Sequence, residues 1–299
     1  MREAKARTII DLLKVASGYL KQRDVKSPRL NAEVLLAHLL GLTRIQLYLQ
    51  FDRLLNEDEL SGYRALIKRR LNREPLQYIT GTQEFWSLDL SIGPSVLVPR
   101  PESELLVEKS LSLLGHGMIP HAEQPRILDL CTGSGALAVA LATEIRNGSF
   151  WASDISSEAI TFARSNACRH GVERRIQFLT GDLWKPVQEQ GVVFDLIVSN
   201  PPYIPSDALQ TLSPEVGHEP QSALDGGEDG MFYIRGILAD GARYLYPGGW
   251  ILVEMDPDQT LKALELMEQT GEYGSKERVK DYSRLYRVVM ARKQVDAGD

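Results

Sequence analysis

The stretch from Asp195 to Tyr203 constrains the fold of this chain more than any other part. Residues 195–199 are mostly apolar and read as a buried parallel strand, which Pro201 and Pro202 cannot continue. Both prolines lack an amide hydrogen and have a fixed φ angle, so the turn is stiff. Because ligands bind at the carboxyl ends of strands in open α/β sheets, we expect this turn to form part of a binding site.

The turn places hydrogen-bond acceptors beside an aromatic ring. The carboxamide of Asn200 and the carbonyl of Pro201 can accept the two hydrogens of a planar –NH2 group, and Tyr203 can stack on its plane. We therefore predict that Asn200, Pro201 and Tyr203 are catalytic and that they hold the substrate together with Pro202. Asn-Pro-Pro-Tyr resembles the signature of S-adenosylmethionine-dependent methyltransferases that act on amide-like or exocyclic nitrogens. A plain loop is the alternative, since Asn and Pro both favour turns.

The second half of the chain alternates between strand and helix patterns. Strands are predicted at 127–129, 150–153, 176–179, 195–199 and 250–254, and helices at about 136–145, 156–170, 231–245 and 257–270. This alternation predicts a parallel sheet with helices on both faces. Two extended runs, 276–280 and 285–292, are expected to close the sheet as an antiparallel hairpin.

A glycine-containing segment, Cys131-Thr132-Gly133-Ser134-Gly135, follows the first strand and opens a helix. Its glycines allow backbone to approach a ligand closely, and the helix start offers free N–H donors. The segment lacks the G-x-G-x-x-G pattern, which disfavours a dinucleotide.

Two acidic residues mark the ends of the next two strands. Asp154 can accept hydrogen bonds from both hydroxyls of a ribose, and Asp182 can accept one from an adenine amino group while Leu183 packs on the base. Together with the segment 131–135 and Asn200, these two residues occupy four successive strand ends. We therefore predict S-adenosylmethionine as cofactor, surrounded by Cys131, Thr132, Gly133, Ser134, Gly135, Asp154, Asp182, Leu183 and Asn200.

The chain before this region divides into a helical part and a linker. Residues 1–74 show helical apolar periodicity, with capped helix starts expected at Ser27-Pro28, Thr43 and Asn56. Residues 75–101 read as a β-hairpin linker, with strands on either side of Gly93-Pro94. We expect the catalytic domain to span residues 102–293.

Charge is distributed unevenly along the chain. Residues 1–75 carry 15 basic and 9 acidic residues (a balance of +6), whereas the remainder carries 19 and 31 (a balance of −12). The basic cluster Lys68-Arg69-Arg70 is either a solvated helix end or a docking face for an acidic protein or RNA phosphates. The acidic catalytic part disfavours stable nucleic-acid binding.

Composition excludes several other classes of protein. No apolar run approaches the ~20 residues that span a bilayer, and no secretory signal is visible at the N-terminus. The two cysteines, Cys131 and Cys168, form no disulfide framework, and the five histidines show no metal-ligand spacing. We therefore expect a cytoplasmic protein without a metal. The lack of an unassigned apolar stretch favours a monomer.

Three further motifs make the resemblance to a family specific. The segments Pro75-Leu76-Gln77-Tyr78-Ile79-Thr80-Gly81, Val98-Pro99-Arg100-Pro101-Glu102-Ser103-Glu104 and 215–230 resemble those of protein-(glutamine-N5) methyltransferases, which modify peptide chain release factors. The resemblance implies a class I S-adenosylmethionine-dependent methyltransferase fold, Rossmann-like and seven-stranded, plus a small N-terminal helical bundle that docks the substrate.

The same resemblance implies the reaction. The methyl acceptor would be the glutamine of the Gly-Gly-Gln motif in release factors, held by Asn200 to Tyr203, with S-adenosylhomocysteine as the product and translation termination as the process tuned. Residues 131–135, 154, 182 and 183 would surround the cofactor.

Some features leave the interpretation open. After Gly248-Gly249 the family reads an acidic residue, an apolar one and glycine, whereas here Glu254-Met255 precedes Asp256-Pro257. An adenine-N6 methyltransferase on DNA or RNA would use the same turn, and a catalytically silent cofactor-binding protein would keep the same sheet. The long polar loop at 204–230 is expected to order over the substrate as a lid.

Overall fold

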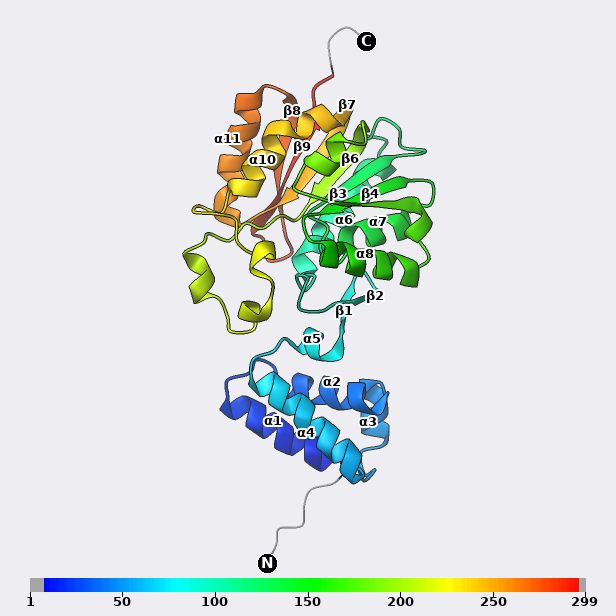
Figure 1. Ribbon diagram of the computed structural model, residues 1–299, viewed down its shortest axis with the longest axis vertical. Helices are drawn as coiled ribbons and strands as arrows, with labels where there is room; N and C mark the ends of the chain where they lie inside the picture. The colour runs from blue at the N-terminus through cyan, green and yellow to red at the C-terminus, as the bar shows by residue number, and fades with distance from the viewer. Residues whose placement is uncertain (1–7, 296–299) are drawn as a thin grey trace, which may run out of the picture. The chain divides into compact units, whose positions relative to one another are not determined.

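The computed structural model describes residues 8–295, which form two units (Figure 1). One unit comprises the chain up to Gly81 together with Ser213–His218, and the other comprises Thr82–Leu212 and the chain from Glu219 onward. The division after Gly81 lies within the segment predicted to be a linker. Within residues 8–295, no helix is both long enough and apolar enough to cross a membrane.

The first unit is helical. Its helices are α1 (Ile9–Gln22), α2 (Pro28–Leu40), α3 (Arg44–Leu49), α4 (Glu57–Leu71) and α5 (Leu76–Thr80). The periodic apolar residues of α1, including Ile9, Leu13 and Leu20, are fully buried in its core. The capped helix starts predicted at Thr43 and Asn56 are both confirmed, and both are capping boxes, since each side chain accepts a hydrogen bond from the third residue of its helix.

The start of α2 was predicted at the right residue but with the wrong contact. Ser27 has a φ of 48° and makes no side-chain capping bond. Instead, Asn31 in the first turn donates from Nδ2 to the carbonyls of Lys26 and Ser27, at 3.0 and 3.1 Å. The side chain of Asn31 therefore bonds the backbone just before the helix, where the sequence predicted a cap by the Ser27 side chain.

The basic cluster at the end of α4 is not a continuous exposed surface. Arg70 is only 5% exposed, and it donates to Asn31 Oδ1 at 2.7 Å and to Glu215 Oε1 at 2.9 Å. Arg69 pairs with Glu74, so only Lys68 in this cluster has an exposed side chain with no ion pair among the described residues. The docking face proposed for the whole cluster is therefore wrong for Arg70.

Glu215 explains why Ser213–His218 belongs to the helical unit. Its carboxylate accepts hydrogen bonds from Arg70 and from Arg73, the second at 3.2 Å. His218 Nε2 lies 3.2 Å from the carbonyl of Asn72. Residues 213–218, in the middle of the predicted lid, are thus held by ion pairs and hydrogen bonds within the helical unit.

The second unit contains the predicted seven-stranded sheet, in the order β5-β4-β3-β6-β7-β9-β8. Its strands are β3 (Arg126–Leu130), β4 (Ser149–Asp154), β5 (Ile176–Thr180), β6 (Phe194–Ser199), β7 (Leu245–Glu254), β8 (Tyr273–Lys280) and β9 (Tyr286–Lys293). The strands from β5 to β7 pair in parallel, while β9 is antiparallel to both β7 and β8. This arrangement confirms the predicted class I methyltransferase fold.

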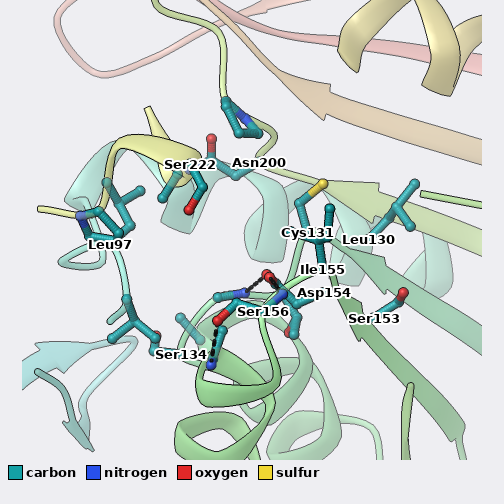
Figure 2. A pocket seen from close by; sticks show the side chains of 18 of the residues that line it. Leu97, Leu130, Cys131, Ser134, Ser153, Asp154, Ile155, Ser156, Asn200 and Ser222 are labelled. Atoms are coloured by element: carbon teal, nitrogen blue, oxygen red, sulfur yellow. Dashed lines mark hydrogen bonds between the residues drawn. The ribbon is translucent and has the colours of Figure 1, made fainter. Parts of the chain in front are cut away.

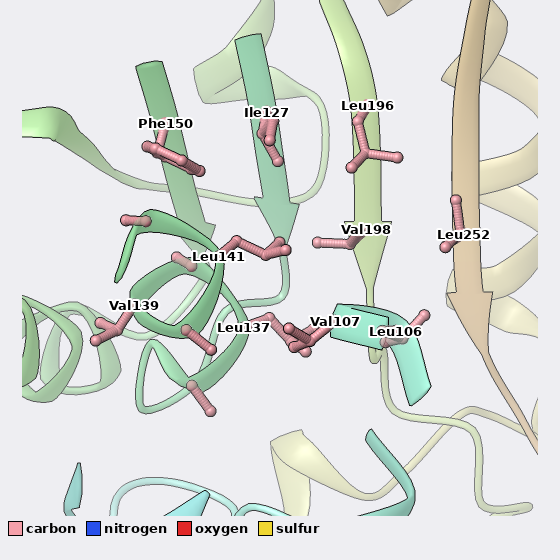
Figure 3. Close-up of a cluster of buried hydrophobic side chains, with 14 of the residues drawn as sticks. Leu106, Val107, Ile127, Leu137, Val139, Leu141, Phe150, Leu196, Val198 and Leu252 are labelled. Carbon is pink, nitrogen blue, oxygen red and sulfur yellow. The ribbon is translucent and has the colours of Figure 1, made fainter. Parts of the chain in front are cut away.

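Helices cover both faces of this sheet. They are α6 (Glu104–Gly115), α7 (Ala136–Glu144), α8 (Ser157–Arg169), α9 (Lys185–Gln188), α10 (Phe232–Asp240) and α11 (Thr260–Thr270). Ile127, Leu196 and Val198 point toward α6 and α7 in one core (Figure 3), whereas Leu128 and Ile197 belong to the opposite core with α10 and α11. The alternation of side chains along each strand thus supplies both cores.

Two local predictions were wrong. The hairpin is formed by β1 (Thr82–Phe85) and β2 (Leu88–Ser91), so its turn lies at Trp86-Ser87 rather than at Gly93-Pro94. Trp86 and Ser87 both have positive φ, as a two-residue type I′ turn requires, but neither is a usual residue there. In addition, α10 ends at Asp240 rather than near 245, because the chain enters β7 through a 3-10 turn.

The loop after β3 is held by a buried carboxylate and a close helix contact. Asp129 is 1% exposed, and its Oδ2 accepts from Thr132 Oγ1 at 2.5 Å and from Ala138 N at 3.0 Å. Burial raises the pKa of the Asp129 carboxyl to about 7. Gly135 begins α7 with a φ of 81°, and a Cβ there would lie 2.9 Å from Cα and Cβ of Ala163 in α8.

We predict that Gly135→Ala destabilises the second unit more than Gly171→Ala does. Both glycines have positive φ, but a Cβ on Gly171 meets no atom within 4 Å. Gly171→Ala should therefore cost only the left-handed backbone strain, about 1–2 kcal/mol, while Gly135→Ala adds an overpacking cost of about 1–3 kcal/mol. Urea unfolding followed by tryptophan fluorescence reports on this unit, because all four tryptophans lie in it. Equal midpoints for the two variants would contradict the close contact between α7 and α8.

We also predict that Asp129 makes stability fall as pH rises from about 4 to 7. The folded protein keeps this proton to about pH 7, whereas the unfolded chain loses it near its ordinary value of 3.8. The unfolded state is therefore favoured across that range, and the effect levels off above pH 7. Between pH 5.5 and 7.5 the wild type should lose about 2 kcal/mol more unfolding free energy than Asp129→Asn. Parallel profiles in urea unfolding would contradict the raised pKa.

Candidate active site

The carboxyl ends of four neighbouring parallel strands surround one pocket in the second unit. Because β5, β4, β3 and β6 are adjacent and parallel, the residues that follow them meet at one edge of the sheet. The pocket has an empty volume of about 980 Å³, part of it open to solvent. Of the predicted site residues, it is lined by Cys131, Thr132, Gly133, Ser134, Asp154, Asp182, Leu183, Asn200 and Pro202.

Figure 2 shows how these residues face one another. Asn200 and Ser222 lie on one side of the pocket, and Ser134, Asp154 and Ser156 lie on the other. The space between them is bounded by side chains from several segments of the chain that lie far apart in sequence.

The loop after β3 presents its backbone to the pocket. Cys131 and Gly133 have φ values of 64° and 56°, and the loop is fastened to β4 by a 2.9 Å bond from Thr132 N to Ser153 O. A Cβ added to Gly133 would meet no atom within 4 Å, so this glycine leaves open space beside its backbone. Gly135, in contrast, does not line the pocket; it faces α8 and shapes the start of α7.

Asp154 at the end of β4 is oriented by the backbone around it. Its Oδ2 accepts from Gly133 N and its Oδ1 from Ser156 N, both at 2.9 Å (Figure 2). Burial raises the pKa of Asp154, and the hydrogen bonds from Ser156 and Gly133 oppose that rise. Each oxygen keeps a second lone pair, so the carboxylate can still accept two hydrogen bonds from a ligand.

Asp182 and Leu183 follow β5 on the same edge. Asp182 is exposed and pairs with Lys185 at 2.9 Å. Leu183 has a φ of 44°, which is rare for a residue other than glycine, and it lines the pocket while also packing against the core of α10. This uncommon backbone geometry brings an apolar side chain to the pocket wall.

The Asn200 turn is held by a helix that sequence reasoning did not connect with it. Asn200 Nδ2 donates to Ser103 Oγ at 2.8 Å, and Ser103 stands just before α6. Pro202 lines the pocket, whereas Pro201 is buried and does not. The motif containing Ser103 was visible in the sequence, but only as a helix start.

Tyr203 is not among the residues that line this pocket, and its role as the stacking residue stays a prediction. Its hydroxyl donates to Glu254 Oε1 at 3.4 Å, and its carbonyl accepts from Gln259 Nε2 at 2.8 Å. Asp256 and Gln259 form a capping box around a 3-10 turn, Pro257–Gln259. The departure from the family pattern at Asp256-Pro257 thus forms an ordered turn that holds Tyr203.

A second buried carboxylate, that of Glu219, hydrogen-bonds two segments of the pocket wall to each other. Its side chain is 2% exposed and accepts from Val98 N at 3.0 Å and from Arg100 Nη2 at 2.6 Å. The segments on either side of these contacts line the pocket through Leu97, Pro99, Pro220, Ser222 and Ala223. None of these lining residues was predicted, because their partners are far away in sequence.

No metal-binding cluster accompanies this pocket. Residues 8–295 contain no group of three or more His, Cys, Asp or Glu side chains arranged to hold a metal ion. Cys131 and Cys168 are free thiols, and burial raises the pKa of the Cys131 thiol above its ordinary range.

Comparisons with known structures agree with this fold. The catalytic domain of hMettl16 in complex with a MAT2A 3′UTR hairpin superimposes with a TM-score of 0.59 at 13% identity, covering 94% of this chain and 92% of that one. The N-terminal domain of human METTL16 in complex with SAH gives 0.53 at 16% identity, covering 94% and 95%. At such identities the likeness extends to the fold alone.

Sequence comparisons are more specific. Residues 11–81 match the PrmC N-terminal domain, and residues 107–219 match the methyltransferase small domain. A release factor glutamine methyltransferase of Geobacter sulfurreducens is 45% identical, covering 88% of this chain and 89% of that protein. One from Chlorobaculum tepidum is 37% identical, covering 96% and 98%. The chain therefore belongs to the family of release factor glutamine methyltransferases.

Proposed function

We propose that this protein transfers the methyl group of S-adenosylmethionine to the side-chain amide nitrogen (N5) of the glutamine in the Gly-Gly-Gln motif of peptide chain release factors. S-adenosylhomocysteine is the other product. The proposal rests on the position of Asn200. This residue lines the pocket at the end of β6, and its carboxamide donates through Nδ2 to Ser103 Oγ. The acceptor oxygen Oδ1 is then available to a substrate –NH2 group.

The residues of the pocket fit S-adenosylmethionine. The open space beside Gly133 admits a ligand close to the backbone, and the oriented carboxylate of Asp154 suits two neighbouring hydroxyls. Leu183 offers an apolar surface beside the carboxylate of Asp182. We assign Gly133, Asp154, Asp182 and Leu183 to the sugar and base of the cofactor, and Cys131, Thr132 and Ser134 to the surrounding wall.

S-adenosylmethionine supplies an electrophilic methyl group on a sulfonium. The protein's part is to orient an amide nitrogen, a poor nucleophile because its lone pair is delocalised into the carbonyl. Asn200 Oδ1 and the carbonyl of Pro201 would accept the two hydrogens of the –NH2 group and direct its lone pair along the line of attack. Such orientation contributes up to about 7–11 kcal/mol to lowering a barrier. As the bond from nitrogen to the methyl carbon forms and the bond from that carbon to sulfur breaks, fixed dipoles in the turn would stabilise the charge that develops on nitrogen. The nitrogen then loses one of its two hydrogens as a proton to solvent.

An adenine-N6 methyltransferase would use the same acceptors, but its substrate requires a basic surface. The chain after residue 75 has a balance of −12, which favours a protein substrate. A cytoplasmic location belongs to the same proposal, because release factors act in translation.

We predict that Asn200→Ala slows methylation strongly. Purified release factor incubated with S-adenosylmethionine should gain one methyl group on the Gly-Gly-Gln glutamine, as read by mass spectrometry. Loss of the acceptor should lower kcat by about 10²–10³. Asn147→Ala, at an exposed asparagine of the same unit, serves as the matched control. Methyl transfer to an adenine-containing duplex instead, or full activity in Asn200→Ala, would contradict the proposal.

We further propose that the helical unit docks the release factor through an apolar surface rather than through the basic cluster. A run of exposed apolar side chains extends along α3 and the loop after it, with Ile45 73%, Leu49 76%, Phe51 54% and Leu54 67% exposed. Such a surface is expected where a protein partner binds.

The double variant Ile45→Glu, Leu49→Glu should raise KM for intact release factor at least about tenfold, since burying each such side chain contributes about 1.5–3 kcal/mol. Methylation of a short Gly-Gly-Gln peptide should stay unchanged. Leu261→Glu, at a 56% exposed leucine of α11, is the control in the catalytic unit. An unchanged KM for intact release factor in the double variant would exclude this surface.

A further inference from the structure

Gln259 is a buried polar residue that takes no part in the chemistry described so far. It is 6% exposed and stands at the end of the 3-10 turn Pro257–Gln259, directly before α11. It is not among the residues that line the pocket. Burying a carboxamide is costly unless its polar atoms find partners, so the two contacts that this side chain makes require an explanation.

The orientation of the Gln259 carboxamide is fixed by two backbone groups. Its Oε1 accepts from Asp256 N at 3.1 Å, and its Nε2 donates to the carbonyl of Tyr203 at 2.8 Å. A backbone N–H can only donate and a carbonyl can only accept, so the reversed orientation would set donor against donor and acceptor against acceptor. The side chain therefore links the start of its own turn to the end of the Asn-Pro-Pro-Tyr turn.

The peptide group between Tyr203 and Ile204 is held on both of its sides. Its carbonyl accepts from Gln259, and its N–H, on Ile204, donates to the carbonyl of Leu224 at 2.9 Å. Gly230 packs against the same carbonyl so closely that a Cβ there would lie 2.2 Å from the oxygen and 2.4 Å from Gln259 Nε2. Of these three contacting residues, only Gln259 acts through its side chain.

The two prolines carry this constraint back toward Asn200. Pro201 and Pro202 have fixed φ angles, and a residue that precedes a proline is restricted to extended ψ values. The main rotations left in the turn are therefore ψ of Pro202 and φ of Tyr203. Holding the Tyr203 carbonyl limits both, so a turn that continues directly from β6 is also fixed at its far end.

We propose that Gln259 is a positioning residue, which fixes the peptide after Tyr203 and thereby holds the acceptors of the Asn200 turn where the substrate –NH2 group binds. This inference rests on the proposed function, because the acceptors matter only if a substrate amide binds them. Since Gln259 does not line the pocket, it acts through the turn rather than by contact with cofactor or substrate. A turn held in place before the substrate binds is what methyl transfer to a weak nucleophile requires.

The first test compares Gln259→Met with Asp256→Ala. Methionine fills a similar volume but leaves the Tyr203 carbonyl without its donor, so kcat for release factor should fall about tenfold, with KM for S-adenosylmethionine within about twofold of wild type. Each variant breaks one half of the capping box, since Asp256 Oδ1 accepts from Asp258 N at 3.1 Å. Asp256→Ala keeps both bonds of Gln259, whose partner on residue 256 is the backbone N–H, and should leave kcat within about twofold of wild type.

A folded Gln259→Met variant with wild-type kcat would overturn the proposal. An Asp256→Ala variant as impaired as Gln259→Met would also overturn it, because loss of the capped turn would then account for the effect. Thermal unfolding of each variant identifies any loss that comes from misfolding.

The second test displaces the same carbonyl without changing Gln259. A Cβ in Gly230→Ala would lie 2.2 Å from the Tyr203 oxygen, so that oxygen has to move, and kcat should fall at least about tenfold while KM for S-adenosylmethionine stays within about twofold. Gly171→Ala is the matched control, because both glycines have a φ of 72° and a Cβ on Gly171 meets no atom within 4 Å. Full activity in a folded Gly230→Ala variant would contradict a role for the position of this carbonyl.

A third measurement separates this inference from the proposed function. In protein labelled with 15N-isoleucine, the backbone amide signal of Ile204 is identified by its absence in Ile204→Val. Its exchange with water should be about tenfold faster in Gln259→Met than in the wild type, because the peptide has lost one of its two bonds. If the wild type methylated no release factor while this difference was present, the proposed substrate would be wrong and the hold on the peptide right. Equal exchange rates in the two proteins would refute the positioning role.

Discussion

Parallel hydrogen bonding among β5, β4, β3 and β6 is the constraint on which the rest of the structure depends. Strands that pair in parallel all end at the same edge of the sheet, so residues that are dozens of positions apart in the chain meet there. Cys131, Asp154, Asp182 and Asn200 reach one pocket for this reason alone. An antiparallel sheet with the same strands would divide them between two edges.

Buried carboxylates hold the segments that this edge brings together. Asp129 accepts hydrogen bonds within the loop after β3, and Glu219 joins two segments of the pocket wall. Glu254 accepts a hydrogen bond from Tyr203 at the end of the Asn200 turn. Each is at most 7% exposed, and burial raises the pKa of Asp129 and Glu254 to about 7. Hydrogen bonds in a dry environment are stronger than in water and lose more when broken, so these groups make the site rigid before a substrate binds. A rigid site is what methyl transfer to a weak nucleophile requires.

Several features were predictable because they depend on neighbours in the chain. The capping boxes at Thr43 and Asn56 follow from three-residue spacings, and the strand pattern follows from apolar runs between turn residues. The errors have a shared cause. Trp86, whose backbone N donates to Glu104 Oε1, forms a hairpin turn with Ser87 at positive φ, and Arg70 is buried by Asn31 and Glu215. In each case a contact with a distant residue overrides the local preference.

The class of the fold, the edge of the sheet that carries the site and the residue types that gather there could all be predicted from the sequence, because periodicity, turn chemistry and strand order are local or nearly local properties. It also supported membership of the release factor glutamine methyltransferases, through motifs that are read in order along the chain. The directions in which the side chains of those motifs point became clear only from the folded structure. Asn200 and Ser103 are 97 positions apart, and no pattern within either segment indicates that their side chains form a hydrogen bond. Hydrogen-bond direction depends on which donors and acceptors packing brings together, and that is settled only when the whole sheet has formed.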